Sequence, residues 1–112
     1  NSRTDFKNFI ESLYKIFYEG SGSLKRIPKD LLLEDSVFFD IKHIRTGIVH
    51  DVEHGKATDI QKKKQKIKNI YNKYSNKKAL EEIAHPMLVH FQRKLVENIK
   101  RELENIKSRI SS

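Results

Sequence analysis

The sequence predicts an all-α protein with a single domain, a bundle of about four helices with one short extra helical turn. Apolar residues recur three or four positions apart along most of the chain, which is the spacing of one helix face, and no segment shows the alternation of a half-buried strand. A length of 112 residues, 37% of them hydrophobic, is enough for one modest core. The chain begins with Asn1 rather than methionine, so we expect either one whole domain or a fragment of a longer protein with further domains.

The first expected helix begins after Thr4, a suitable N-cap residue, and ends at Gly20. Its core face should consist of Phe6, Phe9, Ile10, Leu13 and Phe17. The segment GSGSLKRIPKD that follows has the glycine, serine and proline content of a loop. We expect Leu31 to Leu33 to form a short turn that covers the core.

The second expected helix starts near Asp35 or Ser36 and ends at Gly55, with an apolar face of Phe38, Ile41, Ile48, Val49 and Val52. Thr58 and Gln61 form a capping-box pair that predicts the start of a third helix. The core face of this third helix should comprise Ile60, Ile67, Ile70, Tyr71 and Tyr74.

A break at Ser75 and Asn76 separates the third helix from a short helical piece that ends before Pro86. A long last helix follows, and its apolar residues alternate spacings of three and four, as in the seam of a bundle. The predicted seam consists of Leu88, Phe91, Leu95, Ile99, Leu103, Ile106 and Ile110.

The positive charge of the chain is concentrated in one segment. The net charge is +8, and residues 56–78 contain nine lysines but only one acidic residue, Asp59. Such a segment can attract a polyanion through long-range electrostatics, although a merely solvated lysine face is the alternative. We call its central residues the lysine cluster, which comprises Lys62, Lys63, Lys64, Lys66 and Lys68.

The composition excludes several other classes of protein. Without cysteine the chain has neither a disulfide framework nor a thiolate metal site. No apolar run approaches the roughly 20 residues that a membrane-spanning helix needs. We therefore expect a soluble, cytoplasmic protein that has no contact with a membrane.

The segment HIRTGIVHDVEHGK, residues 43–56, places a cation on the apolar face of the second helix. At 100° per residue, Arg45 lies within about 60° of the surrounding apolar side chains. A buried guanidinium needs an anionic partner or an opening to water, because an unpaired one is costly. The partner could be a phosphate, or a carboxylate of the chain itself, namely Asp40, Asp51 or Glu53.

His43, Gly47, His50 and His54 follow one another along the opposite strip of the same helix. A glycine inside a helix costs about 1 kcal/mol relative to alanine, so we expect another backbone or a phosphate to approach Gly47 closely. His43 and His54 could equally be ordinary surface residues. The letters HDVEH, residues 50–54, match the pattern of inverted zinc peptidases with Glu53 as base, but such enzymes need a larger fold. A structural metal on His50 and His54 is a further alternative, and for the function itself we expect no metal and no cofactor.

The segment IRTGIVHDVEHG resembles the signature of the HEPN superfamily, an arginine and a histidine separated by four to six residues in a helical bundle of about this length. The matching pair is Arg45 and His50, with four residues between them and the pair His54-Gly55 behind. The position after the arginine, often Asn or Asp in the family, is Thr46 here. Val52 occupies the position of a tyrosine that the toxin branch carries, so adenylylation there is not expected.

The resemblance implies a metal-independent endoribonuclease that acts as a homodimer, with the motifs of two subunits in one cleft. His50 would be the general acid and base, and Arg45 would bind the scissile phosphate. Both roles suit the side chains, since an imidazole can take and give a proton near neutral pH and a guanidinium binds phosphate oxygens in pairs. Further RNA contacts are expected from Thr46, Gly47, His54, Lys62, Lys63 and Lys66. The alternative is a non-catalytic helical module that binds protein, nucleotide or RNA.

Overall fold

The structure is a computed structural model, and it describes residues 2–20, 27–49 and 57–111. Its α-helices are α1 (Ser2–Tyr14), α2 (Val37–Val49), α3 (Ala57–Ser75) and α4 (His85–Ser111). Short helical turns are η1 (Lys15–Glu19), which continues α1, η3 (Lys29–Leu31) and η4 (Leu80–Glu82). The described ranges contain no strand, so the predicted all-α fold of about four helices with short extra turns is confirmed.

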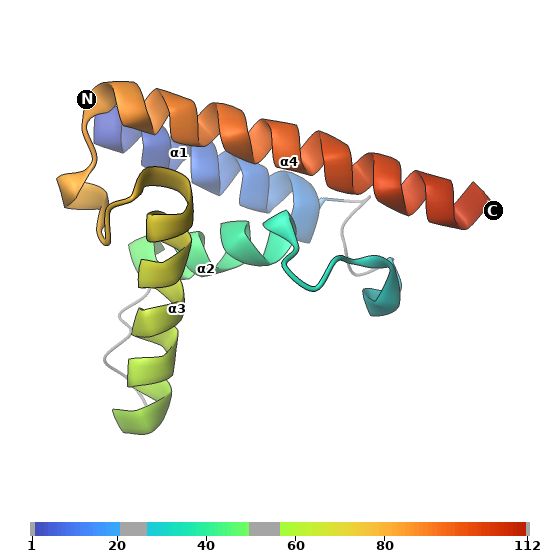
Figure 1. Cartoon of the computed structure of the whole chain (residues 1–112), viewed down its shortest axis with the longest axis horizontal. Helices are drawn as coiled ribbons and strands as arrows, with labels where there is room; N and C mark the ends of the chain where they lie inside the picture. Colours follow the sequence, from blue (N-terminus) through green and yellow to red (C-terminus); the bar gives the residue numbers. More distant parts are fainter. Residues whose placement is uncertain (1, 21–26, 50–56, 112) are drawn as a thin grey trace.

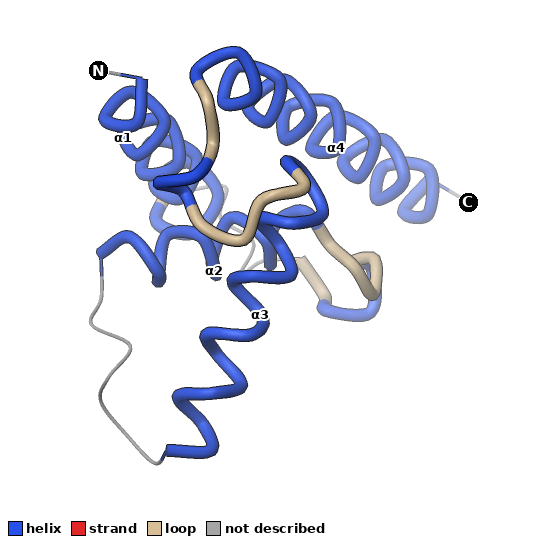
Figure 2. Tube along the Cα trace, turned by 60° about the vertical axis from the view of Figure 1, so that its left-hand side comes forward, coloured by secondary structure: helices blue, strands red, loops and turns tan. Residues whose placement is uncertain are grey.

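Helices α1 and α4 lie side by side and run in the same direction, and α2 packs against both of them (Figure 1). Helix α3 leaves the bundle crosswise to α4, and its first turns extend away from the other helices (Figure 1 and Figure 2). The buried residues of α3 accordingly belong to its C-terminal half, namely Ile70, Tyr71, Tyr74 and Ser75.

An aromatic cluster around Phe91 of α4 joins three helices in the core. The Phe91 ring lies edge-on to Phe6 of α1, with ring centroids 4.9 Å apart, and stacks with Tyr74 of α3 at 4.8 Å. Tyr71 contacts the same ring from one turn earlier on α3 at 6.0 Å. Aromatic rings in such arrangements bury large apolar areas, so Phe91 ties the projecting helix α3 to the parallel pair α1 and α4.

The two predicted N-caps were wrong. Helix α1 begins at Ser2 and α3 at Ala57, so Thr4 and Thr58 both lie in the first turn rather than before it. Arg3 explains the early start of α1, because its guanidinium donates a 2.7 Å hydrogen bond to the carbonyl of Glu81 and holds this first turn against η4. Gly20 does end the first helical segment, as expected.

The apolar face of α2 is wider than predicted. Ile44 is fully buried and was missed, because α2 packs against α1, α3 and α4 and is covered on more than one side. Leu31 and Leu32 pack against the core as expected, whereas Leu33 is partly exposed. The second helix was expected to reach Gly55, but residues 50–56, including Val52, lie outside the described residues.

The seam of α4 departs from the prediction near the C-terminus. Leu103 is 40% exposed and Ile110 is 66% exposed, whereas Glu102 is buried. The physical reason is that the end of α4 reaches past the other α-helices, as Figure 1 shows, and so has fewer helices to pack against. The rest of the predicted seam, from Leu88 to Ile99 together with Ile106, is buried as expected.

Candidate active site

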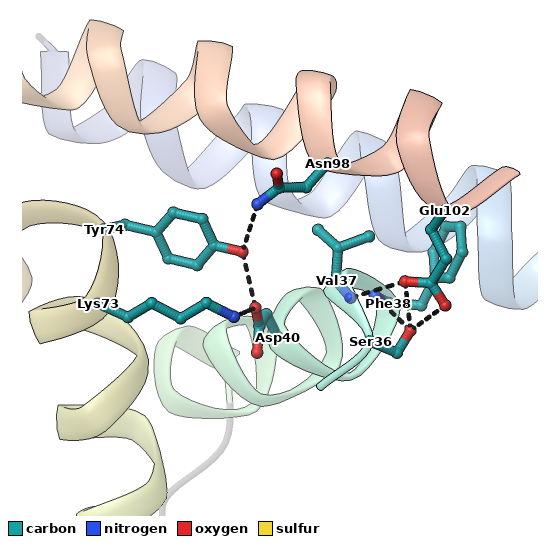
Figure 3. A network of polar contacts seen from close by, with 8 residues as sticks. All are labelled: Ser36, Val37, Phe38, Asp40, Lys73, Tyr74, Asn98 and Glu102. Atoms are coloured by element: carbon teal, nitrogen blue, oxygen red, sulfur yellow. Dashed lines mark hydrogen bonds and ion pairs between the residues drawn. The ribbon is translucent and has the colours of Figure 1, made fainter. Parts of the chain in front are cut away.

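Helix α2 carries the arginine of the motif, and a carboxylate from α4 fixes where this helix begins. Ser36 precedes α2 and its Oγ accepts a hydrogen bond from the Phe38 amide at 3.1 Å, which makes Ser36 the N-cap. The carboxylate of Glu102 accepts hydrogen bonds from Ser36 Oγ at 2.7 Å and from the Val37 amide at 2.9 Å (Figure 3). A negative charge at a helix N-terminus is favourable, so this buried group anchors α2 to α4.

A second polar group in Figure 3 connects α2 to α3. Asp40 accepts hydrogen bonds from Tyr74 Oη at 2.7 Å and from Lys73 Nζ at 2.9 Å. Asn98 of α4 donates to Tyr74 Oη at 3.4 Å. Burial, and then the neighbouring Asp40, raise the pKa of Tyr74, so its hydroxyl stays a donor at physiological pH. The two polar groups together hold α2 in a fixed orientation under α4.

Arg45 forms an ion pair with Glu11 of α1. Its Nε lies 3.0 Å from Glu11 Oε2, its Nη2 lies 3.5 Å from Oε1, and its guanidinium covers the Tyr14 ring at 4.0 Å from the centroid. The hydrogen bond from Arg45 is the main reason why the pKa of Glu11 lies below its usual value. The side chains of Arg45 and Glu11 are 19% and 31% exposed, so the pair lies at the surface margin of the α1–α2 contact.

A carboxylate of the chain does bind Arg45, but it is Glu11, which was not among the three expected partners. Asp40 binds Lys73 and Tyr74 instead, and Asp51 and Glu53 lie outside the described residues. The bonds to Glu11 use Nε and Nη2, whereas a guanidinium has five N–H donors. No other acceptor in the described ranges bonds the rest of the group.

Thr46 and Gly47 have contacts within the fold. The Thr46 hydroxyl donates a 2.9 Å hydrogen bond to the Lys42 carbonyl one turn earlier. A Cβ on Gly47 would lie 3.1 Å from Cδ1 of Ile67, so the glycine lets α3 come close to α2. The close neighbour that we expected at Gly47 is thus an isoleucine side chain of the chain itself, rather than a backbone.

Of the three histidines in this segment, the structure describes only His43. His43 is half-buried rather than an ordinary surface residue, and it lines a hollow of about 450 Å³ with Lys66 and Lys73. Burial first, and then the neighbouring Lys66 and Lys42, lower the pKa of His43, so this imidazole is neutral at pH 7. His50 and His54 lie outside the described residues. Among the residues that are described, no group of three His, Asp or Glu side chains is placed to bind a metal ion.

The lysine cluster lies on the part of α3 that leaves the bundle (Figure 2). Lys62, Lys63, Lys66 and Lys68 are exposed, and Lys64 is half-buried. The cluster is divided by the contact of Ile67 with Gly47: Lys66 lines the hollow at His43, whereas Lys64 and Lys68 line a second hollow that includes Gly47. Lysines thus lie on both sides of the Ile67–Gly47 contact, although Glu34, Asp35 and Asp40 also line the hollow at His43 and Glu81 lines the second hollow.

Comparisons with protein-family models, with curated proteins and with solved structures found no match for this chain. No helix in the described ranges is long and apolar enough to cross a membrane. Function must therefore be inferred from the motif and from the geometry around Arg45. Glu11 and Tyr14 are the residues that sequence reasoning missed at this site. Their only sequence signal is that they lie three residues apart, on neighbouring positions of one helix surface.

Proposed function

We propose that this chain is a metal-independent endoribonuclease of the HEPN type, which acts as a cytoplasmic homodimer. The observation that supports this most is the orientation of the Arg45 guanidinium and its remaining hydrogen-bond donors. A guanidinium five residues before His50 is oriented by a carboxylate and an aromatic ring, yet keeps donors without an acceptor among the described residues. Such a group can bind a phosphate without rearranging, and oriented donors of this kind favour the transition state.

The reaction would be an internal transesterification. His50 removes the proton from a ribose 2′-hydroxyl, and the 2′-oxygen attacks the adjacent phosphorus. The bond to the 5′-oxygen of the next nucleotide breaks, and this oxygen receives a proton from an imidazolium. The products are a 2′,3′-cyclic phosphate and a 5′-hydroxyl. Arg45 binds the non-bridging phosphate oxygens as their charge grows, and Glu11 acts as a positioning residue for Arg45.

The spacing of the two motif residues supports a homodimer, and a kink of the helix at Gly47 is the alternative. In one straight helix, Arg45 and His50 are about 140° apart around the axis and about 7.5 Å apart along it, which is awkward for one phosphate. A two-fold axis brings an arginine and a histidine from each copy to a common place. The lysine cluster would then guide RNA toward the cleft, with His54 and Thr46 at its margin.

The rival proposal is a non-catalytic helical module that binds protein, nucleotide or RNA. One observation favours it: the ion pair of Arg45 with Glu11 and its stacking on Tyr14 connect α1 to α2 and have a structural use without any substrate. Under this proposal Arg45 matters for the fold, whereas under the first it matters for the reaction.

Arg45→Gln separates the two proposals. Because Glu11 is partly exposed, it can be hydrated once its partner is gone, and we expect the melting temperature to change by only a few degrees. RNA cleavage should fall about 100-fold, as for the loss of one transition-state donor. Arg93→Gln, at an exposed position of α4, is the matched control and should cut RNA at the parental rate. Full RNA cleavage by a stable Arg45→Gln protein would contradict the role of Arg45 in the reaction. A parental protein that cuts no RNA, together with an Arg45→Gln protein that melts much earlier, would favour the rival proposal.

A further inference from the structure

A hollow of about 530 Å³ opens between α1 and α3, at the described end of α2. Its floor is apolar and includes Ile48 and Ile67. Its rim is cationic, with Lys7 from α1, Lys64 and Lys68 from α3, and Lys78 from the turn that follows α3. Glu81 is the one acidic residue among the residues that line it. We call this hollow the lysine groove.

The lysines of the groove come from three separate segments, so the periodicity of a single helix did not gather all of them. Lys7, Lys68 and Lys78 are exposed, and none of the three forms an ion pair with a residue that the structure describes. Like charges that converge on one hollow repel each other, and an anionic ligand relieves that repulsion. The groove is thus suited to a ligand that carries several negative charges and also an apolar part.

The groove adjoins the candidate active site. Gly47 and Ile48 line it, and both lie between Arg45 and His50 in the motif. Lys7 lies four residues before Glu11 on α1, which places their Cβ atoms about 5–6 Å apart on one helix face. Glu11 in turn holds Arg45. The groove therefore borders the helix of the motif, and one of its lysines lies one helical turn from the carboxylate that binds Arg45.

We propose that the lysine groove binds a single-stranded stretch of RNA next to the phosphate that is cut. Phosphates contact Lys7, Lys68 and Lys78, and a base or ribose covers the apolar floor. A nucleotide fits a hollow of this size, whereas a duplex, whose bases are stacked inside, cannot place one there. This inference rests on the proposed function for the position of the cut, but the binding itself does not depend on cleavage.

Two triple variants with the same loss of charge test the groove. The first is Lys7→Gln, Lys68→Gln, Lys78→Gln. The control is Lys94→Gln, Lys100→Gln, Lys107→Gln, at exposed positions of α4 that do not line the groove. The probe is a fluorescent 12-nucleotide RNA with 2′-O-methyl groups, which cannot be cut, and its anisotropy gives Kd over a range of salt concentrations. Circular dichroism melting curves verify that both variants fold.

We expect the groove variant to weaken binding at least tenfold at about 150 mM salt, and to reduce the slope of log K against log salt by about 2, because a single strand loses roughly 0.7 per phosphate contact. The control variant should stay within about threefold of the parent, since its lysines contribute only long-range attraction. A duplex of the same length should bind the parent and the groove variant alike.

Three results would overturn the inference: equal weakening by both variants, unchanged binding by the groove variant, or displacement of the RNA by polyglutamate of equal charge at equal concentration. Cleavage of unmodified RNA tests the proposed function separately. If the parental protein cuts RNA and the groove variant binds and cuts RNA as the parent does, only the proposal about the groove is wrong. If the parental protein cuts no RNA but the groove variant binds RNA more weakly than the parent, the groove binds RNA and the proposed cleavage is wrong.

Discussion

The His50→Ala variant is expected to lose RNA cleavage by about 1,000-fold while it folds normally. The imidazole is the only group of the motif that can both accept the 2′-hydroxyl proton and protonate the leaving oxygen, and general acid–base catalysis contributes about 10²- to 10⁴-fold. Initial rates of cleavage of a fluorescent RNA, measured over pH 5–9, give the size of the loss and show whether a proton-transfer group near neutral pH has disappeared.

His90→Ala is the matched control for this variant, because His90 is exposed on α4 and lies outside the motif. It should cleave at the parental rate and melt at the parental temperature. A His50→Gln variant serves as a second control, since glutamine keeps a polar side chain but cannot transfer protons at neutral pH. Cleavage by His50→Gln at the parental rate would be evidence for the non-catalytic module, with activity arising from a contaminant.

The largest expected effect on stability comes from Glu102→Ala. The Glu102 carboxylate is 1% exposed and accepts hydrogen bonds from Ser36 Oγ, from the Val37 amide and, at 3.3 Å, from the Leu33 amide. Its removal leaves these buried donors without an acceptor, at a cost of about 3 kcal/mol in the free energy of unfolding. For a domain of this size, that lowers the melting temperature by roughly 10 °C or more.

Two further variants give this measurement its reference points. Glu104→Ala, at an exposed position of the same helix, should change the free energy of unfolding by less than about 0.5 kcal/mol. Glu102→Gln keeps one acceptor oxygen and should lie between Glu102→Ala and the parent. Urea unfolding followed by circular dichroism distinguishes them. Equal stability of Glu102→Ala and Glu104→Ala would mean that the contact between α4 and the start of α2 contributes nothing.

The core face of α1 could be predicted from the sequence because its periodicity is regular and Phe6, Ile10 and Leu13 face only the bundle. The same reasoning chose Leu103 over Glu102 on α4. Hydrophobicity decides such a choice, and Glu102 is buried only because α2 presents the N-cap Ser36 and unpaired amides to it. A partner on another helix, 66 residues away, leaves no trace in the local pattern of either segment.

At the candidate site, the sequence predicted that Arg45 needs an anion and that something approaches Gly47 closely. Both predictions are local, since they follow from a charge on an apolar face and from a glycine in a helix. The identity of each neighbour is not local. Glu11 and Ile67 meet α2 only because α1 and α3 pack on either side of it. The lysine groove was missed for the same reason, because Lys7 lies on α1, outside the segment where the charge is concentrated.

The central claim, metal-independent cleavage through the 2′-hydroxyl, is tested most directly by incubating purified parental protein with RNA in excess EDTA and identifying the product ends. We predict cleavage at an undiminished rate, with 2′,3′-cyclic phosphate and 5′-hydroxyl ends, and no cleavage of DNA of the same sequence, which lacks the attacking hydroxyl. Cleavage that appears only after addition of Mg²⁺ or Zn²⁺, or products with 5′-phosphate and 3′-hydroxyl ends, would contradict the assignment of Arg45 and His50 to this reaction.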